Sequence, residues 1–254
     1  MTTPTIELLS RHGSVRKHTP DPVPPELIEA MVQAAQRAST SSNLQMVSVV
    51  AVTARERRAA LAKICGQEHV ERAPVVLVWC ADLRRLDRAC ELRGYTQVTR
   101  YVENLLVAVL DVGIAAQNAA VAAESLGLGI CYLGSVRNDA RAVIDLLALP
   151  AHVFPVVGMT VGWPAAAPLV RPRLPASAVL YWETYDPAPR DEALRAYDRA
   201  MVATGIYQGR QVPVPGKPDE VEDYGWLEHS ARRVAQPART DLRAVLARQG
   251  FLLE

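Results

Sequence analysis

The sequence lacks the features that mark secreted, disulfide-stapled and general nucleic-acid-binding proteins. Its four cysteines form no Cys-x-x-Cys pair, so we expect free thiols in a reducing cytoplasm. The N-terminus has no charged region followed by an apolar one, and no asparagine begins an Asn-x-Ser/Thr sequon, so no secretory signal is predicted. The net charge is only +1, which argues against nucleic-acid binding and leaves the basic residues as local anion-binding groups.

A metal site is not predicted, because the histidines lack ligand spacing with the cysteines. The five histidines are His12, His18, His69, His152 and His229, and the four cysteines are Cys65, Cys80, Cys90 and Cys131.

The long apolar run at 99–126 predicts the strongest helix of the chain. Its only charge between Asn104 and Ala123 is Asp111, so a membrane span is an open alternative. Polar residues within the run, such as Gln117, favour a buried helix and hence no membrane association. A helix that is apolar on nearly every side must be surrounded, and a second subunit is its natural cover.

The remaining pattern predicts alternating helices and strands without an internal repeat. We expect strands at 46–53, 74–81, 129–135 and 153–163, and helices at 25–38, 54–64, 137–149, 190–203 and 241–249. Residues 82–98 are charged and indeterminate, 176–187 are expected to be extended, and 205–225 to be loop-rich. We expect a single domain, 1–254, in which about 205–254 form a C-terminal excursion too poor in apolar residues for its own core.

A basic turn at residues 10–19 is the first candidate binding element. It carries Arg11, Arg16 and Lys17 together with two histidines and three hydroxyls. Guanidinium groups, hydroxyls and free backbone N–H groups are what a phosphate requires. A solvated basic surface turn is the alternative.

Gly127 and Gly129 have the Gly-x-Gly spacing that begins the Rossmann dinucleotide-binding motif. The stretch 127–135 runs from a helix into a strand, which is the reverse of the Rossmann order, so that motif is excluded. Glycine here is expected to end the helix and to let backbone approach a flat ligand.

Several motifs in order and spacing are similar to those of the nitroreductase superfamily. They are the His-Gly-Ser-Val-Arg turn at 12–16, Ala-Ala-Glu-Ser-Leu-Gly-Leu-Gly at 122–129, Gly-Trp-Pro at 162–164 and Arg-Pro-Arg-Leu-Pro-Ala-Ser at 171–177. The chain most resembles the branch of oxygen-insensitive major nitroreductases and NADPH-flavin oxidoreductases, over nearly its whole length.

The resemblance implies an α+β fold and an intertwined homodimer. The expected nitroreductase-like fold has a central, mostly antiparallel sheet flanked by helices and extended by C-terminal residues of the partner. Two FMN sites lie at the subunit interface in such proteins.

The resemblance also carries cofactor roles onto particular positions. The turn and the later Arg-Pro-Arg segment match the elements that hold the FMN phosphate, ribityl chain and pyrimidine, while Arg16 is expected at the phosphate or the N1/O2 edge. The polar loop at 39–43 matches the family's ribityl-binding loop, which comes from the partner subunit. Gln67 matches a glutamine whose amide meets the edge of the flavin ring. The strand at 130–135 matches one whose backbone N–H groups reach toward flavin N5 and O4. The FMN candidates are His12, Gly13, Ser14, Arg16, Ser39, Thr40, Ser41, Asn43, Gln67, Ile130, Cys131, Leu133, Gly134, Ser135, Arg171 and Arg173.

Two departures from the family pattern are visible. Gly13 stands where the family often has arginine, so one positive charge is missing or is replaced by Arg11. Arg171 stands where the family has lysine, which keeps the charge but changes the donor geometry. For the 2′-phosphate of NADPH, the candidates are Arg210, Arg232 and Arg233, with a solvated basic tail as the alternative.

The resemblance implies a cytoplasmic FMN-dependent oxidoreductase. It would pass hydride from NAD(P)H, with NADPH favoured over NADH, through flavin N5 to a small-molecule acceptor by a ping-pong mechanism. The acceptors expected are nitroaromatics, quinones or free flavin. Because the flavin supplies the chemistry, no catalytic side chain is predicted. Dehalogenation or flavin fragmentation on the same fold, or a non-catalytic flavin-binding regulatory protein, are the alternatives.

Overall fold

The computed structural model describes residues 2–254, apart from the side chain of Pro218. The chain divides into two compact units. One comprises the residues up to Leu169 together with Arg239–Glu254, and the other comprises Val170–Ala238. This boundary precedes residue 205, where the composition of the sequence changes.

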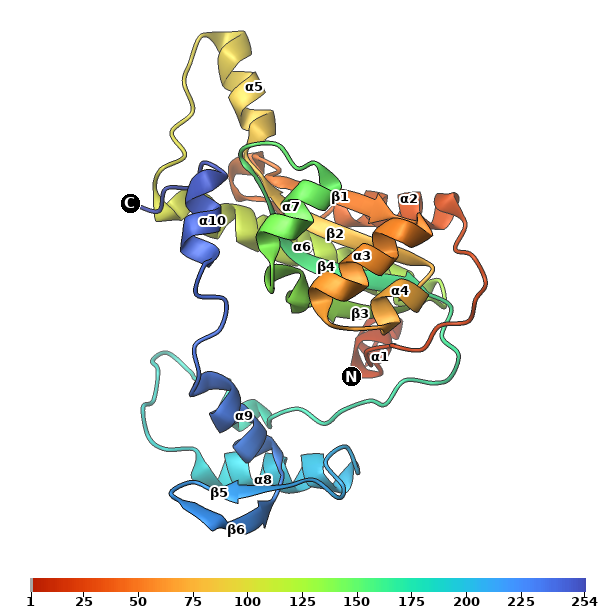
Figure 1. Cartoon of the computed structure of the whole chain (residues 1–254), viewed down its shortest axis with the longest axis vertical. Coiled ribbons are helices and arrows are strands. Elements are labelled where there is room, and N and C mark those ends of the chain that lie inside the picture. The colour runs from red at the N-terminus through yellow and green to blue at the C-terminus, as the bar shows by residue number, and fades with distance from the viewer. Residues whose placement is uncertain (1) are drawn as a thin grey trace. The chain divides into compact units, whose positions relative to one another are not determined.

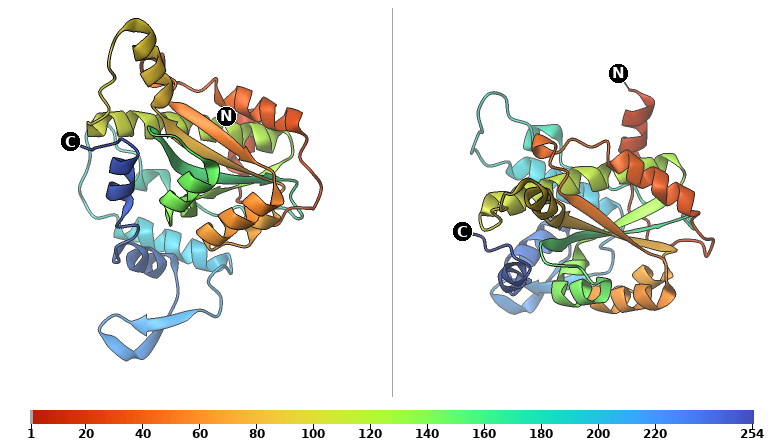
Figure 2. Two further views of the ribbon diagram at one scale, coloured as in Figure 1. Left: turned by 45° about the horizontal axis from the view of Figure 1, so that its top comes forward. Right: turned by 90° about the horizontal axis from the view of Figure 1, so that it is seen from above.

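The first unit is built on a four-stranded antiparallel sheet. Its strands are β1 (Val47–Val52), β2 (Val75–Asp82), β3 (Gly129–Leu133) and β4 (Val153–Gly162), in the order β1-β2-β4-β3. All four strands predicted from the sequence are confirmed. The sheet with helices on both sides (Figure 2) is the α+β nitroreductase-like arrangement that was expected.

Alternation along β2 shows why both faces of this sheet are covered. Leu77 and Trp79 belong to one apolar cluster and Val76 and Val78 to the other, and every residue of β2 is buried. Side chains of a strand point alternately to opposite faces, so a run that is apolar at every position needs a helical layer on each side.

Eight helices are described in this unit (Figure 1), and those that the sequence predicted begin and end close to the predicted residues, whereas α4 was not predicted. They are α1 (Pro4–Ser10), α2 (Pro25–Ala35), α3 (Arg55–Cys65), α4 (His69–Arg72), α5 (Arg84–Arg93), α6 (Val102–Ser125), α7 (Ala140–Leu147) and α10 (Leu242–Arg248). Helix α5 fills the segment that the sequence left indeterminate, and it contributes no buried residue. Gly127, at φ +82°, follows the end of α6 as expected for a helix-terminating glycine.

Helix α6 is long and apolar enough to cross a membrane, yet one of its faces lies in the protein core. The buried face is lined by alanines, which let the helix pack closely against α2 and the sheet. The opposite face exposes an apolar row spaced by four residues, Val102, Leu106, Leu110 and Ile114. One chain therefore covers only half of this helix.

The C-terminal residues bond within the same chain. Glu254 donates its backbone N–H to Arg100 (2.7 Å) and accepts from Val102 (3.2 Å), and Phe251 packs edge-on against Phe154 in the core. Strand β1 lies at one edge of the sheet, and its extension by a partner's C-terminal residues stays a prediction.

The second unit contains regular structure where the sequence predicted loops. A hairpin joins β5 (Gln211–Val214) to β6 (Lys217–Asp223), so the loop-rich prediction for 205–225 is wrong. Its turn holds Pro215 followed by Gly216 at φ +78°, the pairing that a type II turn prefers. Residues 176–187 begin with a short 3₁₀ helix, η3 (Ala176–Ala178), rather than an extended run.

Two helices complete the second unit. They are α8 (Asp191–Ala203), which was predicted, and α9 (Trp226–Val234), which was not. Tyr197 of α8 meets the ring of Trp226 edge-on at 4.8 Å, and the Asp198 carboxylate accepts the Leu227 N–H at 2.9 Å. These contacts join the two helices.

Candidate active site

The basic turn and strand β3 lie side by side although more than a hundred residues separate them. The Val15 N–H donates to the Ile130 carbonyl at 2.8 Å. A Cβ on Gly129 would lie only 2.5 Å from a methyl carbon of Val15, so glycine is required for this approach. Two elements predicted separately as cofactor-binding are thereby brought together.

Alternation within the turn decides which side chains face outward. Gly13 and Val15 are buried, whereas Ser14 and Arg16 are exposed and His12 is half-buried. The ring of His12 is held by Glu124 at the end of α6, with 2.5 Å between Nδ1 and Oε1. The hydroxyl and the guanidinium that were predicted to bind a phosphate are therefore the ones presented to solvent.

Gly13 has a packing explanation for its departure from the family pattern. A Cβ at this position would lie 2.8 Å from the Leu169 carbonyl oxygen and 2.8 Å from Cβ of Pro168. Backbone cannot move aside as a flexible side chain can, so an arginine here would require the chain to shift. The missing charge at residue 13 follows from this close contact.

The loop that carries Gln67 lies near the same turn. Gln67 is exposed beside Gly66, which adopts φ +64° at the end of α3. Two residues later, burial lowers the pKa of His69, and the nearby Arg16 charge lowers it further. Arg16 and the Gln67 loop therefore share one electrostatic environment.

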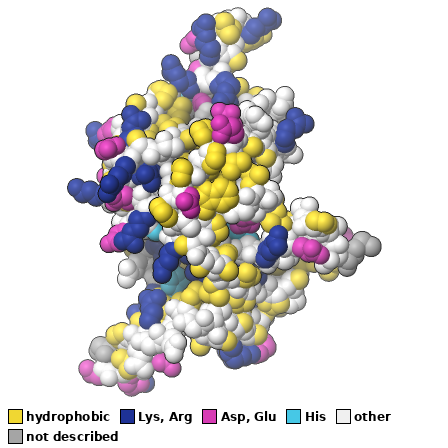
Figure 3. Space-filling model, turned by 90° about the vertical axis from the view of Figure 1, so that its right-hand side faces the viewer, with side chains coloured by type: hydrophobic (Ala, Val, Ile, Leu, Met, Phe, Trp, Pro, Cys, Tyr) yellow, Lys and Arg dark blue, Asp and Glu magenta, His cyan; other side chains and the backbone are white. Residues whose placement is uncertain are grey.

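His18 extends this group of basic side chains. Its backbone bridges to Pro164, and its ring occupies the space that a Cβ on Gly162 would need. Burial lowers its pKa first, and the neighbouring His69 adds to the shift while the Gly162 backbone opposes it. Figure 3 shows one face of the molecule, on which Lys and Arg side chains are numerous and some histidine atoms are visible.

A second pair of cations lies beside β3 and was not predicted from the sequence. A Cβ on Gly134 would lie 3.6 Å from Nη2 of Arg137 and 4.0 Å from Nη2 of Arg239. Arg137 donates to the Val156 carbonyl and Arg239 to Asn138 Oδ1 (3.0 and 3.2 Å), so both bond to neutral oxygens. Burial, and then the Arg239 charge, lower the pKa of Arg137. Arg137 follows the predicted strand directly and could have been found from its position, whereas Arg239 carries no local signal.

The side chains of the predicted strand residues point inward. Ile130, Cys131, Leu133 and Ser135 are buried. A contribution of this segment to a ligand would therefore come from its backbone.

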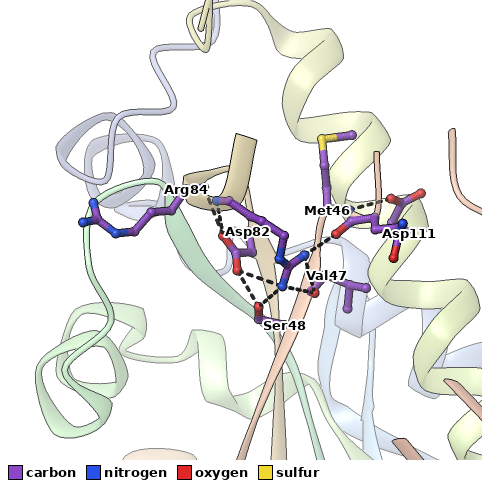
Figure 4. Close-up of polar contacts among 8 residues, drawn as sticks. Met46, Val47, Ser48, Asp82, Arg84 and Asp111 are labelled. Carbon is purple, nitrogen blue, oxygen red and sulfur yellow. Dashed lines mark hydrogen bonds and ion pairs between the residues drawn. The ribbon is translucent and has the colours of Figure 1, made fainter. Parts of the chain in front are cut away.

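The polar loop Ser39–Gln45 is held from two sides. The Asp111 carboxylate accepts the N–H group of Met46 at 2.9 Å (Figure 4) and that of Ser41 at 3.2 Å. Arg85 donates to the Gln45 carbonyl at 2.6 Å. These bonds run to α6 and α5. Its predicted place beside the flavin of a partner subunit stays a prediction.

In the second unit, the Arg-Pro-Arg segment has its own anchor. Tyr197 donates its hydroxyl to the Pro172 carbonyl at 3.2 Å, and Arg173 donates to the carbonyls of Arg171 and Pro172. Arg171 lies close enough to Tyr207 to affect its pKa, although burial, which raises it, has the larger effect. Their predicted role in binding the phosphate stays a prediction.

The three NADPH candidates differ in what they contact. The Arg232 guanidinium donates hydrogen bonds to the Glu228 carboxylate and, from Nη2, to the Pro213 carbonyl oxygen at 2.6 Å. Arg210 instead stacks over the Tyr224 ring, 4.3 Å from its centroid, and lines a hollow of about 410 Å³ with Tyr207. Arg233 is exposed on α9. Arg210 is the candidate placed beside a cavity.

The donors around the turn fit an anionic, planar cofactor such as FMN. Nε2 of His18 and Nε2 of His69 are buried and have no hydrogen-bond partner among the described residues. Buried polar atoms are normally paired, so these nitrogens require a further partner. A phosphate and a ring edge with carbonyl oxygens supply acceptors and negative charge to the imidazoles and to Arg16.

Comparison with known proteins identifies the class. A model of the nitroreductase family matches residues 9–163, and one of the nitroreductase family C-terminal domain matches residues 171–254. The chain belongs to the nitroreductase family.

The similar proteins within this family are of nearly the same length. A Cr(VI) reductase of Pseudomonas sp. (strain G-1) is 38% identical over 246 residues, 96% of this chain and 98% of that protein. An oxygen-insensitive NADPH nitroreductase of Salmonella typhimurium is 38% identical over 250 residues, 98% of each chain. The solved structure of B. megaterium NfrA2 has a TM-score of 0.91 and 33% identity, and the match covers 100% of both chains.

The two lowered histidine pKa values predict an acid-sensitive flavin-free protein. In the unfolded chain these imidazoles regain a pKa of about 6.5, so below that pH the unfolded state binds more protons than the folded one. The stability of the folded state is therefore highest above about pH 6.5, and it decreases as the pH falls through the lower pKa values of the folded protein. We expect the thermal midpoint to fall over this range, and to fall less in His18→Phe. An equally steep fall in the variant would contradict this.

Proposed function

We propose that this protein transfers electrons from NADPH to nitroaromatics, quinones or free flavin by a ping-pong mechanism. The broader activity follows from the family and the similar proteins: the chain is an FMN-dependent NAD(P)H oxidoreductase. The choice of acceptor and the order of binding are the parts that are proposed. The observation that carries the proposal is the contact of the basic turn with β3, which gathers Arg16, His18 and His69, and these three side chains join no ion pair within the described part of the chain.

The individual cofactor contacts are likewise proposed. Ser14 and Arg16 point outward from the turn, and we assign Arg16 to the phosphate or to the N1/O2 edge. Arg171 and Arg173 are assigned to the phosphate, and Gln67 to the ring edge. Backbone N–H groups of 130–135 are assigned to N5 and O4, because the side chains there are buried.

When bound, FMN supplies the redox chemistry by accepting hydride from the nicotinamide and passing it to the acceptor. The chain contributes binding, orientation and charge. A positive group at the N1/O2 edge stabilises the negative charge that a reduced flavin develops. Arg16 meets that requirement because its guanidinium supplies a positive charge and several N–H donors.

We propose a homodimer whose interface includes the outer face of α6. Leu110 and Ile114 are 62% and 44% exposed, in a row that continues for three turns along the helix. Contiguous exposed apolar surface of this kind marks an interface. A dimer would also allow the polar loop Ser39–Asn43 of one subunit to serve the flavin of the other. The buried face of α6 makes a core helix of it, and we place the enzyme in the cytoplasm.

An anionic acceptor is a second candidate substrate. Arg137 and Arg239 lie side by side with only neutral acceptors. The similar Pseudomonas protein is named a Cr(VI) reductase. Chromate is an oxyanion, and paired guanidinium groups suit such a ligand.

Rapid mixing of the purified yellow protein with NADPH under anaerobic conditions tests the function. We expect loss of the oxidised-flavin absorbance, and its return when nitrofurazone or a quinone is added. In Arg16→Ala we expect FMN to dissociate on dilution, because one charge-assisted contact, worth about 1.5–3 kcal/mol, is lost. Flavin that is bound but never reduced would favour a non-catalytic role. Unchanged retention in the variant would remove Arg16 from the site.

Arg210→Ala tests the selection of NADPH. We expect KM for NADPH to rise about tenfold, with little change for NADH, because only NADPH carries the 2′-phosphate. Arg232→Ala is the matched control, since that guanidinium is already bonded to Glu228 and Pro213. Equal effects on both nicotinamides would contradict the assignment.

Leu110→Lys tests the interface. A charge in the centre of an apolar contact should shift the protein from dimer to monomer in light scattering, and FMN affinity should fall with it. Val234→Lys, at an exposed valine of α9, should leave the dimer intact. A wild-type protein that is monomeric at micromolar concentration would contradict the homodimer.

A further inference from the structure

The polar loop at residues 39–46 has an unfavourable backbone. Ser42, Asn43 and Gln45 adopt φ of 49°, 55° and 54°. Residues other than glycine rarely adopt this left-handed conformation, because their Cβ atom clashes with the backbone. Here three of the four residues 42–45 adopt it. Such a conformation persists only where surrounding contacts impose it.

The Asp111 carboxylate makes contacts that bracket this loop. Oδ1 accepts the N–H of Ser41 at 3.2 Å and Oδ2 accepts the N–H of Met46 at 2.9 Å, so the two oxygens hold both ends. Figure 4 shows the Asp111 side chain directed from α6 toward Met46. Asp111 is only 2% exposed, and within the described part of the chain it joins no ion pair.

The chemistry of these two bonds requires a carboxylate. Both partners are N–H donors, and each oxygen of an ionised carboxylate accepts. An asparagine of the same shape would present one oxygen and one NH₂ group, so one of the two backbone N–H groups would face another donor. A buried charge in an otherwise apolar helix is costly unless such bonds compensate it.

Arg85 holds the same loop from its outer side. Its guanidinium donates to the Gln45 carbonyl at 2.6 Å and to the Ser48 hydroxyl at 3.1 Å, and Asp82 lies 3.6 Å away. The loop is thus fixed at Ser41 and Met46, on either side of its left-handed residues, and at Gln45, which is one of them.

We propose that Asp111 is a positioning residue that imposes the left-handed loop and so presents its polar side chains to the flavin. The proposal rests on the proposed function, in which Ser39, Thr40 and Asn43 contact the ribityl chain. Asp111 touches neither flavin nor substrate and acts only through the loop backbone.

Asp111→Asn is the direct test because it keeps the shape and removes one acceptor. Amide hydrogen exchange at residues 41–46, measured on the flavin-free protein, should become at least about tenfold faster, as expected when one buried bond is lost. The dissociation constant of FMN should rise by about the same factor. Asn118→Ala is the matched control: it lies two turns further along α6, where its amide bonds to Ala34 on α2, and it should leave both readouts unchanged.

Rescue by glycine separates loop shaping from general stabilisation. Ser42→Gly removes the steric penalty at φ 49°, so in the Asp111→Asn background it should restore FMN affinity to within about threefold of wild type. A carboxylate that merely stabilised the core would not be rescued in this way, and absence of rescue would overturn the proposal.

A second variant covers the case in which Asp111→Asn does not fold. Arg85 is largely exposed, so Arg85→Ala should fold and should accelerate exchange at Gln45 and Met46, while Arg88→Ala on the same helix should not. Unchanged exchange in both loop variants, or faster exchange with unchanged FMN affinity, overturns the proposal. A wild-type protein that binds no FMN overturns the proposed function instead, because the exchange measurements need no flavin.

Discussion

The contact between the backbone of the basic turn and strand β3 is the constraint on which the rest of the candidate site depends. It exists because Gly129 has no side chain to separate Val15 from the strand, and because Gly13 lets the turn lie against Leu169. With these small residues inward, Ser14 and Arg16 must point outward. The arrangement of binding groups is thus a consequence of close backbone packing.

Among the described residues, Arg16, Arg137 and Arg239 join no ion pair with an acidic side chain, although the whole chain is nearly neutral. Arg16 raises the cost of protonating His69, and Arg239 does the same to the charge of Arg137. Like charges in half-buried positions destabilise a protein by themselves, and an anionic ligand offsets that cost. Groups whose pKa values are perturbed in this way mark a candidate functional site.

The sequence was sufficient for the strands of the main sheet, the long helix and the basic turn, because apolar periodicity and local residue types determine them. It failed for the β5–β6 hairpin, where Pro213, Pro215 and Gly216 favoured a loop. In a two-stranded sheet both strands are edges, and an edge tolerates proline. Nor could the sequence bring Arg239 to Arg137, since only the folded chain joins residues a hundred positions apart.

Helix α6 shows how one element can serve several purposes. Its alanine face packs closely enough to support the sheet, its outer apolar row is exposed, and Asp111 reaches the polar loop. A helix of 24 residues moves as a rigid body, so the apolar row and the carboxylate cannot shift independently. A partner packed against the outer row would therefore also fix the carboxylate that shapes the loop. This explains why Asp111 is retained on the buried face of α6: the geometry of the loop depends on this carboxylate, and the packing of the core does not.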